Sequence, residues 1–176
     1  NNEIYRSPCH IKWKHGDVPA DAEITWEIRY NYIHTAEGHT IAAGIQTSEA
    51  YLFMHHNIIA GMGLAAEGGF GVATSYDSQQ GDNAIVTHNT FYDVDKGVFT
   101  GSSAVTSANN TVRDNIFYTF ISQACSSFRC GIGWFTQLST LAALNTLNYD
   151  LYHGQGVGAI VASVQSSPTY TFAQLQ

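Results

Sequence analysis

An asparagine placed directly before apolar residues recurs along the chain, and this repeat constrains the fold more than any other feature of the sequence. The copies are NNEIY at 1–5, RYNYIH at 29–34, HHNIIA at 55–60, THNTFY at 87–92, RDNIFY at 113–118 and a weaker member, NYDLYH, at 148–153. The aligned positions are 26 to 35 residues apart and hold Asn2, Asn31, Asn57, Asn89, Asn115 and Asp150. Repeats of this length are typical of solenoids, in which each copy forms one turn of a coil.

The residues around each asparagine predict strands. Apolar and polar residues alternate in segments such as ITWEIR at 24–29, and a period of two indicates a strand with one buried face. Two positions after the aligned residue, every copy is apolar, with Ile4, Ile33, Ile59, Phe91, Phe117 and Tyr152. We expect these side chains to line the inside of the coil, with each asparagine at the bend between two strands. Asparagine tolerates the left-handed backbone conformation, and its amide both donates and accepts, so stacked copies are expected to form a ladder.

The phrases NNEIY, RYNYIH, HHNIIAG, THNTFYDVDKGV and RDNIFY resemble the right-handed parallel β-helix family, which includes pectate-lyase-like and other carbohydrate-active proteins. The resemblance implies an all-β fold, a right-handed parallel β-helix of about five or six coils with an asparagine corner ladder. We expect one domain over 1–176, with coils over 1–134 and a terminal coil and cap segment over 135–176. Because solenoids normally carry polar caps, we also expect a fragment of a longer protein. The alternative is an α/β or sandwich protein with chance matches.

Charge and composition limit the classes of ligand and the cellular location that we expect for this protein. The net charge is −7, and no Lys or Arg occurs between Arg29 and Lys96, which argues against nucleic acid as a ligand. No run of about 18 apolar residues is present, so we expect no membrane span. Cys125 and Cys130 bracket a short loop and are either a local disulfide or two ordinary thiols. From the family resemblance we expect an extracellular or periplasmic protein.

The segment IKWKHGD at 11–17 supplies candidate catalytic residues. If Ile11 and Trp13 face inward, Lys12 and Lys14 project outward together, with Arg29 one coil away. Lyases that cleave uronic-acid polymers need a base for the proton beside the carboxylate and a cation that neutralises this carboxylate. The resemblance implies that Lys or Arg serves as the base and calcium as the neutralising cation. The alternative is two solvated lysines beside a buried tryptophan.

A second group of candidates lies just before the aligned asparagines. The two preceding positions hold the pairs Arg29-Tyr30, His55-His56, Thr87-His88 and Arg113-Asp114. Aromatic rings stack on apolar sugar faces and polar tips bind hydroxyls, so we predict that this strip binds substrate. The predicted substrate-binding residues are Tyr30, His55, His56, His88 and Arg113. Two alternatives remain, turn chemistry alone and a metal cluster of the three histidines.

Other acidic residues give weaker signals. Asp93 and Asp95, or Glu67, would be the starting point for a hydrolase, but nothing in the sequence fixes the pair of carboxylates that glycosidases need. Our leading hypothesis is therefore a protein that binds or degrades polysaccharide, with lyase chemistry on uronate-containing glycans ahead of hydrolysis. The negative charge would repel such polymers unless calcium bridges them. The alternative hypothesis is a non-catalytic structural or adhesive module, which associates with further coils or with itself through its open ends.

Overall fold

The structure is a computed structural model, and it describes residues 2–5, 9–13, 26–34, 42–47, 52–62, 69–74, 83–94, 96–99, 109–119, 132–136, 146–148, 150–154, 160–164 and 170–171. The regular elements within these segments are all β-strands. None of the described segments forms a helix with the length and hydrophobicity needed to cross a membrane. Lys14, Cys125 and Cys130 lie outside the described residues, and so does most of the expected cap segment.

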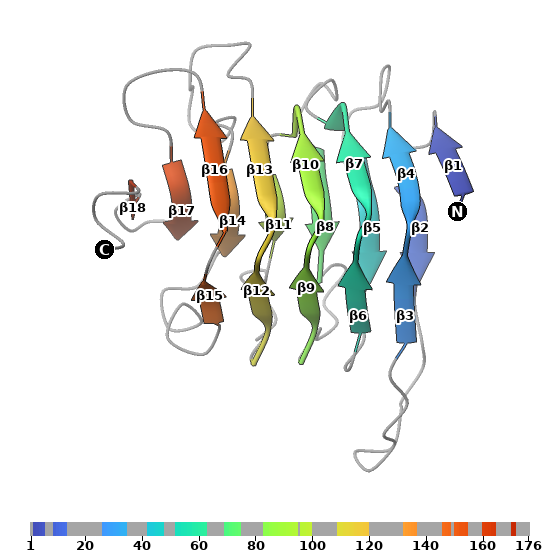
Figure 1. Cartoon of the computed structure of the whole chain (residues 1–176), viewed down its shortest axis with the longest axis horizontal. Coiled ribbons are helices and arrows are strands. Elements are labelled where there is room, and N and C mark those ends of the chain that lie inside the picture. The colour runs from blue at the N-terminus through green and yellow to red at the C-terminus, as the bar shows by residue number, and fades with distance from the viewer. Residues whose placement is uncertain are drawn as a thin grey trace.

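The described strands form three sheets (Figure 1). Sheet A contains β1 (Asn2–Tyr5), β4 (Asn31–His34), β7 (Ile58–Ala60), β10 (Thr90–Tyr92), β13 (Ile116–Thr119) and β16 (Leu151–Gly154). Sheet B contains β2 (Cys9–Trp13), β5 (Ala42–Thr47), β8 (Gly69–Ala73), β11 (Lys96–Phe99), β14 (Ile132–Thr136), β17 (Ile160–Val164) and β18 (Tyr170–Thr171). Sheet C contains β3 (Trp26–Arg29), β6 (Leu52–His55), β9 (Ile85–Thr87), β12 (Thr111–Arg113) and β15 (Thr146–Asn148).

Neighbouring strands within each sheet run parallel, except for β17 and β18, which are antiparallel. From β3 to β14 the chain visits sheets C, A and B in turn, so strands that are neighbours in a sheet lie three elements apart in the chain. This arrangement is a parallel β solenoid, and it confirms the all-β, β-helix-like fold expected from the repeat.

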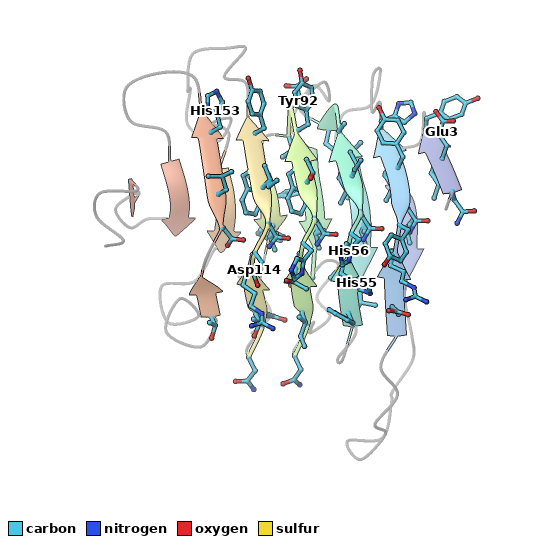
Figure 2. All side chains as sticks on the ribbon, in the orientation of Figure 1. Glu3, His55, His56, Tyr92, Asp114 and His153 are labelled. Atoms are coloured by element: carbon cyan, nitrogen blue, oxygen red, sulfur yellow. The ribbon has the colours of Figure 1, made fainter. Side chains whose placement is uncertain are left out.

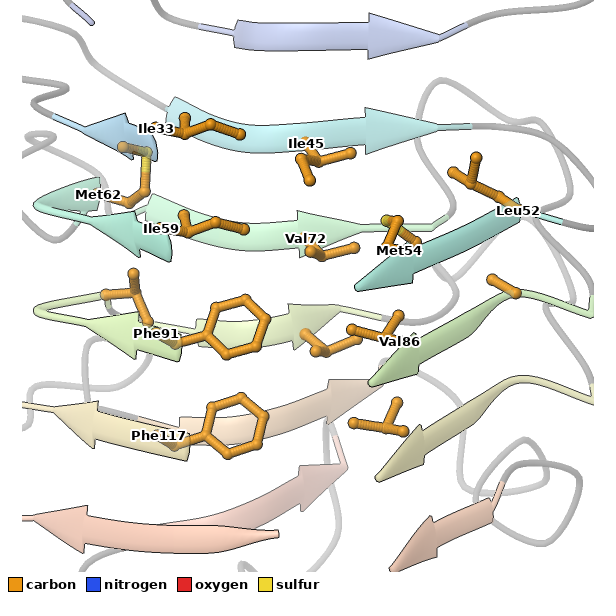
Figure 3. Packing of buried hydrophobic residues seen from close by; sticks show 14 residues of the cluster. Ile33, Ile45, Leu52, Met54, Ile59, Met62, Val72, Val86, Phe91 and Phe117 are labelled. Atoms are coloured by element: carbon orange, nitrogen blue, oxygen red, sulfur yellow. The ribbon is translucent and has the colours of Figure 1, made fainter. Parts of the chain in front are cut away.

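The pairing register matches the sequence alignment. Ile33 pairs with Ile59, and Phe91 pairs with both Ile59 and Phe117. All four side chains are buried and form one column of the core, with the Phe91 and Phe117 rings stacked at 4.8 Å between centroids (Figure 3). Burying a side chain of this size stabilises the fold by about 1.5–3 kcal/mol relative to leaving it exposed. The core column therefore fixes which residue of each coil lies above which.

Two glycines in sheet B leave space for the side chains of this core column, which lie directly against their backbone. A Cβ added to Gly71 would lie 2.4 Å from a ring carbon of Phe91 and 2.6 Å from the carbonyl oxygen of Gly97. At Gly44 an added Cβ would lie 2.6 Å from Ile59. Because real Cβ atoms do not approach so closely, the aromatic column requires glycine on the opposite strand.

The asparagine ladder is present and continuous. The side-chain amide of each member donates to the Oδ1 of the next coil, at 3.0 Å from Asn31 to Asn57 and from Asn57 to Asn89. Asn2 opens the ladder, and at the other end Asn115 donates to the carboxylate of Asp150 at 2.9 Å. The backbone N–H of each asparagine from Asn31 to Asn115 donates to the same Oδ1, so the four rungs from Asn31 to Asp150 are each held twice.

One detail of the expected corner was wrong. The left-handed backbone belongs to the residue before each asparagine, with φ of 56° at Tyr30, 54° at His56, 55° at His88 and 55° at Asp114. The asparagine follows this bend, and from Asn31 to Asn115 its amide also donates to the carbonyl two residues earlier. The asparagine ladder thus stabilises the bend, while the residue before each asparagine adopts the left-handed conformation.

Candidate functional site

The bend from sheet C to sheet A carries a row of polar and aromatic side chains. We call this row the corner strip and define it by the four pairs Arg29-Tyr30, His55-His56, Thr87-His88 and Arg113-Asp114. Parallel pairing brings Arg29, His55, Thr87 and Arg113 into one register column, one residue per coil. In Figure 2 the labelled His55, His56 and Asp114 lie at the junctions between the sheet C and sheet A strands.

The left-handed residues of the strip project outward because the backbone turns there. The N–H of His56 donates to the carbonyl of His88, and the N–H of His88 donates to that of Asp114, so the bends also stack. A left-handed conformation costs a typical residue other than glycine about 1–2 kcal/mol, and asparagine, aspartate and histidine are found in it more often than other side chains. Elsewhere in the described chain, positive φ occurs only at Gly61, Asn83, Asp93 and Asn109, which tolerate it well. The corner strip alone places Tyr and His side chains in this conformation.

A chain of short hydrogen bonds runs through the strip from a carboxylate to an exposed imidazole. Glu27 Oε1 lies 2.6 Å from His55 Nε2, and His55 Nδ1 lies 2.7 Å from Nδ1 of His56. His55 is nearly buried and stacks on Phe53 at 4.2 Å, whereas His56 is exposed. The second oxygen of Glu27 receives the Nε–H of Arg29 at 3.3 Å. Glu27 is therefore held at both oxygens, and it holds His55 in turn.

The rings of the strip face one another. The rings of His56 and His88 are parallel within 4°, with 5.2 Å between their centroids. The Tyr30 ring, one coil before His56, is tilted against the His56 ring at 5.2 Å between centroids. The inner nitrogen of His88 contacts the Thr87 hydroxyl at 2.9 Å. Ring faces that contact each other are not open to a sugar, so the strip presents ring edges and their outer nitrogens. Hydrogen bonding at ring edges is thus available along the row, and sugar stacking on an outer ring face stays a prediction.

Two guanidinium groups lie on either side of the histidines. Arg29 is half exposed, and its Cζ lies 5.5 Å from the centre of the Tyr30 ring. Arg113 is equally exposed and lies 3.7 Å from a carboxylate oxygen of Asp114. Exposed ion pairs of this kind contribute little to stability, so Arg113 can exchange its carboxylate for a ligand at low cost. Arg29 contacts Glu27 through Nε and can bind a ligand with its terminal nitrogens.

The expected cluster of Lys12, Lys14 and Arg29 stays a prediction. Lys12 belongs to β2 in sheet B and Arg29 to β3 in sheet C, so the two residues lie in different sheets. The side chain of Lys12 and the whole of Lys14 lie outside what the structure describes. Within the described residues no group of three or more His, Cys, Asp or Glu side chains is arranged to hold a metal ion.

Sequence reasoning missed Glu27 as a member of the site. Its position in the alternating segment ITWEIR places it on the same face as Arg29, and that signal was available. Its contact with His55 was not, because Glu27 pairs directly with Phe53 and reaches His55 diagonally across two coils. Of the acidic residues considered for a hydrolase, Asp93 is described, and burial raises the pKa of its carboxyl group.

Fold and site together define a class, a parallel β solenoid with a polar, ring-lined corner that includes a Glu–His–His chain. Comparisons of this chain with protein-family models, with curated proteins and with solved structures found no match. The case for a function therefore rests on the geometry of the corner strip.

Proposed function

We propose that this protein binds uronate-containing polysaccharide along the corner strip and degrades it by β-elimination. In this proposal the solenoid is a right-handed parallel β-helix of about five or six coils of the pectate-lyase-like kind, in an extracellular or periplasmic protein. The observation that carries the proposal is the corner strip itself. It offers an arginine or histidine edge on successive coils, and it keeps Tyr and His in a conformation that costs stability.

The chemistry of the strip suits a linear acidic glycan. Successive coils repeat at about 4.8 Å, so a row of equivalent groups runs along the solenoid axis and suits a ligand that is also linear and repetitive. Arg29 and Arg113 match carboxylates in charge and in planar geometry. The outer nitrogens of His56 and His88 and the Tyr30 hydroxyl match sugar hydroxyls. Backbone strain at surface residues is a mark of functional sites, which favours a ligand over a purely structural corner.

The overall charge sets a condition on this proposal. The chain carries a net charge of −7, so its long-range field repels a polyuronate. We propose that calcium bridges the polymer to the protein and lowers this repulsion. The predicted Lys12 and Lys14 would add positive charge for the same substrate, and the candidate catalytic trio with Arg29 belongs to this proposal.

An activity and binding screen tests the proposed function. Purified protein is incubated with uronate-containing and with neutral polysaccharides, each with calcium and with a chelator. Retardation in gels that contain the polysaccharide reports binding, ultraviolet absorbance reports unsaturated products, and reducing-end assays report any cleavage. We expect retardation and absorbance with uronate polymers in calcium. Reducing ends without absorbance would contradict β-elimination, and silence in all three assays from folded protein would contradict the proposal.

A non-catalytic structural or adhesive module is the second candidate, and one observation favours it. The outer face of sheet A exposes Tyr32, Ile58, Ile116 and Leu151, with 62% of Leu151 accessible. Glu3 is the one Asp, Glu, Lys or Arg in the six strands of this sheet. An exposed apolar face with almost no charge is a feature of association surfaces. Sedimentation at several protein concentrations tests it, and self-association that Ile58→Ser and Leu151→Ser abolish would favour this second role.

A further inference from the structure

We propose that His56 is the general base of the β-elimination, with His55 and Glu27 acting as its proton relay. This inference rests on the proposed function and assigns the base to a histidine in place of the lysines predicted from the sequence. Three observations carry it: the two short hydrogen bonds that join the residues, the burial of the middle ring, and the exposure of the last one.

The hydrogen bonds determine where the protons lie. An ionised carboxylate only accepts, so the Nε2 of His55 carries a hydrogen and donates it to Glu27. In neutral His55 the Nδ1 is then an acceptor, so Nδ1 of His56 must carry the hydrogen that joins the two rings. Consequently the outer Nε2 of neutral His56 holds a lone pair, and among the described residues it has no hydrogen-bond partner. The arrangement prepares an exposed nitrogen to accept a proton.

The relay also determines where the positive charge goes. When His56 accepts a proton at Nε2, it can pass the Nδ1 proton to His55, which then becomes an imidazolium 2.6 Å from the Glu27 carboxylate. Phe53 stacks on His55 and Arg29 holds the second oxygen of Glu27, so this pair keeps its geometry. Glu27 and His55 are thus positioning residues for His56.

The chemical step balances with the groups of the strip. The Nε2 of His56 takes the proton from C5 of the uronate, and the electron pair left on C5 forms the C4–C5 double bond. The bond between C4 and the glycosidic oxygen breaks, and this oxygen takes a proton from Nε2 of His88 in its imidazolium form, which becomes neutral. Arg29 neutralises the uronate carboxylate with its terminal nitrogens, while its Nε–H stays on Glu27. His88 is suited to the donor role because its ring lies parallel to His56 and the Nδ1–H of its imidazolium can donate to the Thr87 hydroxyl. Proton exchange with water then returns both histidines to their starting forms.

A second Glu–His pair provides a matched control. Glu3 lies 3.0 Å from the Nε2 of His34 on the outer face of sheet A, and its side chain is 62% exposed, against 39% for Glu27. The pair belongs to β1 and β4, away from the bend that carries the corner strip. Substitution of Glu3 therefore removes a comparable ion pair and leaves the relay intact.

The kinetic test compares His56→Gln, Glu27→Gln and Glu3→Gln. We expect His56→Gln to lower kcat by roughly 10²–10⁴-fold, the usual contribution of a general base, with polysaccharide retardation in gels preserved. Glu27→Gln is expected to lower kcat with little change in KM, since it alters charge stabilisation and not the binding surface. Glu3→Gln should change neither constant. An unchanged kcat in His56→Gln would overturn the inference, and an increase of KM alone would do so too.

A spectroscopic test does not depend on turnover. In protein labelled with ¹⁵N at histidine, the nitrogen shifts above the histidine titration range report which ring nitrogen is protonated. We expect His56 to carry its hydrogen on Nδ1, and we expect Glu27→Gln to change the His55 shifts while Glu3→Gln leaves them unchanged. Protonation of His56 at Nε2 in the wild type would overturn the relay.

The two proposals fail in distinguishable ways. Polysaccharide retardation without any unsaturated product in the wild type would overturn His56 as a base and leave binding along the corner strip standing. Loss of retardation for all uronate polymers, from folded protein, would overturn the proposed function itself. Unsaturated product that persists in His56→Gln but disappears in a variant with Lys12, Lys14 and Arg29 all changed to Ala would assign the base to the sequence-predicted trio instead.

Discussion

Two bends of the solenoid perform the same backbone task with different residues. The bend into sheet A uses Tyr30, His56, His88 and Asp114, whereas the bend into sheet C uses Asn83 and Asn109. All six have φ between 54° and 58°. Asparagine adopts this conformation at low cost, histidine is found in it less routinely than asparagine, and tyrosine is rare in it. Since asparagine is sufficient for the backbone at one bend, the backbone alone does not require rings at the other, and this difference supports the proposed role of their side chains. The comparison teaches that backbone preference is overridden at the bend where we propose the site.

The largest expected effect separates the two bends by function. We expect His56→Asn to abolish most lyase activity, by roughly 10²-fold or more, because the general base is lost. The matched change Asn109→Gln should leave activity unaltered, because Asn109 belongs to the other bend. Initial rates of unsaturated-product formation measure both variants. Equal losses of activity in both variants would show that activity depends on an intact bend and not on the imidazole of His56.

Removing a ladder rung should have the largest effect on stability. Asn57 is 1% exposed, and its Nδ2 donates to Ile28, His55 and Asn89 while its Oδ1 accepts from Asn31. Each buried group left without a partner costs about 1–3 kcal/mol, so Asn57→Ala should destabilise by roughly 3 kcal/mol or more. Urea unfolding followed by circular dichroism measures this loss. A cost near zero would mean that the ladder does not brace the bend.

The ladder and the core were predictable from the sequence because their residues recur at one position per coil. The aligned asparagines and the apolar residues two positions later specify the bend and the inward face without knowledge of the register. The left-handed residue was misplaced by one position because asparagine, present in nearly every copy, is the better-known residue for that conformation than Tyr30, His56 or His88. Glu27 escaped prediction because a diagonal contact across coils becomes visible only when the strands are paired.

The end of the ladder provides a smaller effect. Asp150 accepts from both the backbone N–H of Asn115, at 2.7 Å, and its side-chain amide, at 2.9 Å. Hydrogen bonds to a charged acceptor contribute about 1.5–3 kcal/mol, compared with about 1 kcal/mol for neutral pairs. We therefore expect Asp150→Asn to destabilise by about 1 kcal/mol and Asp150→Ala by more. Urea unfolding midpoints measure both variants, and the midpoint of Asp150→Asn should lie between those of the wild type and Asp150→Ala. A midpoint of Asp150→Asn at or above the wild type's would contradict a stabilising charged acceptor.

A reciprocal exchange tests the backbone cost itself. Replacing His88 by Asn should stabilise the protein by about 1 kcal/mol, because asparagine removes the left-handed penalty. Replacing Asn109 by His should destabilise the protein by a similar amount, because the histidine would adopt the left-handed conformation there without a parallel ring to stack on. Thermal and urea unfolding of both variants measure the exchange. If His88→Asn were less stable than the wild type, ring stacking with His56 would outweigh the strain.

The smallest effect concerns Asp93, whose carboxyl is partly buried at the bend that follows β10. Burial raises the pKa of Asp93, because desolvation disfavours the charged form. The folded state therefore binds this proton more tightly than the unfolded state, and stability falls as pH rises from the unfolded pKa through the folded one. Asn at this position keeps the left-handed bend and cannot ionise. We expect Asp93→Asn to be the more stable protein at neutral pH. The advantage should shrink as pH falls through the raised pKa of the folded state, and it should be gone below the ordinary pKa of aspartate. Urea unfolding at a series of pH values measures the difference, and an advantage that is constant with pH would contradict desolvation as its cause.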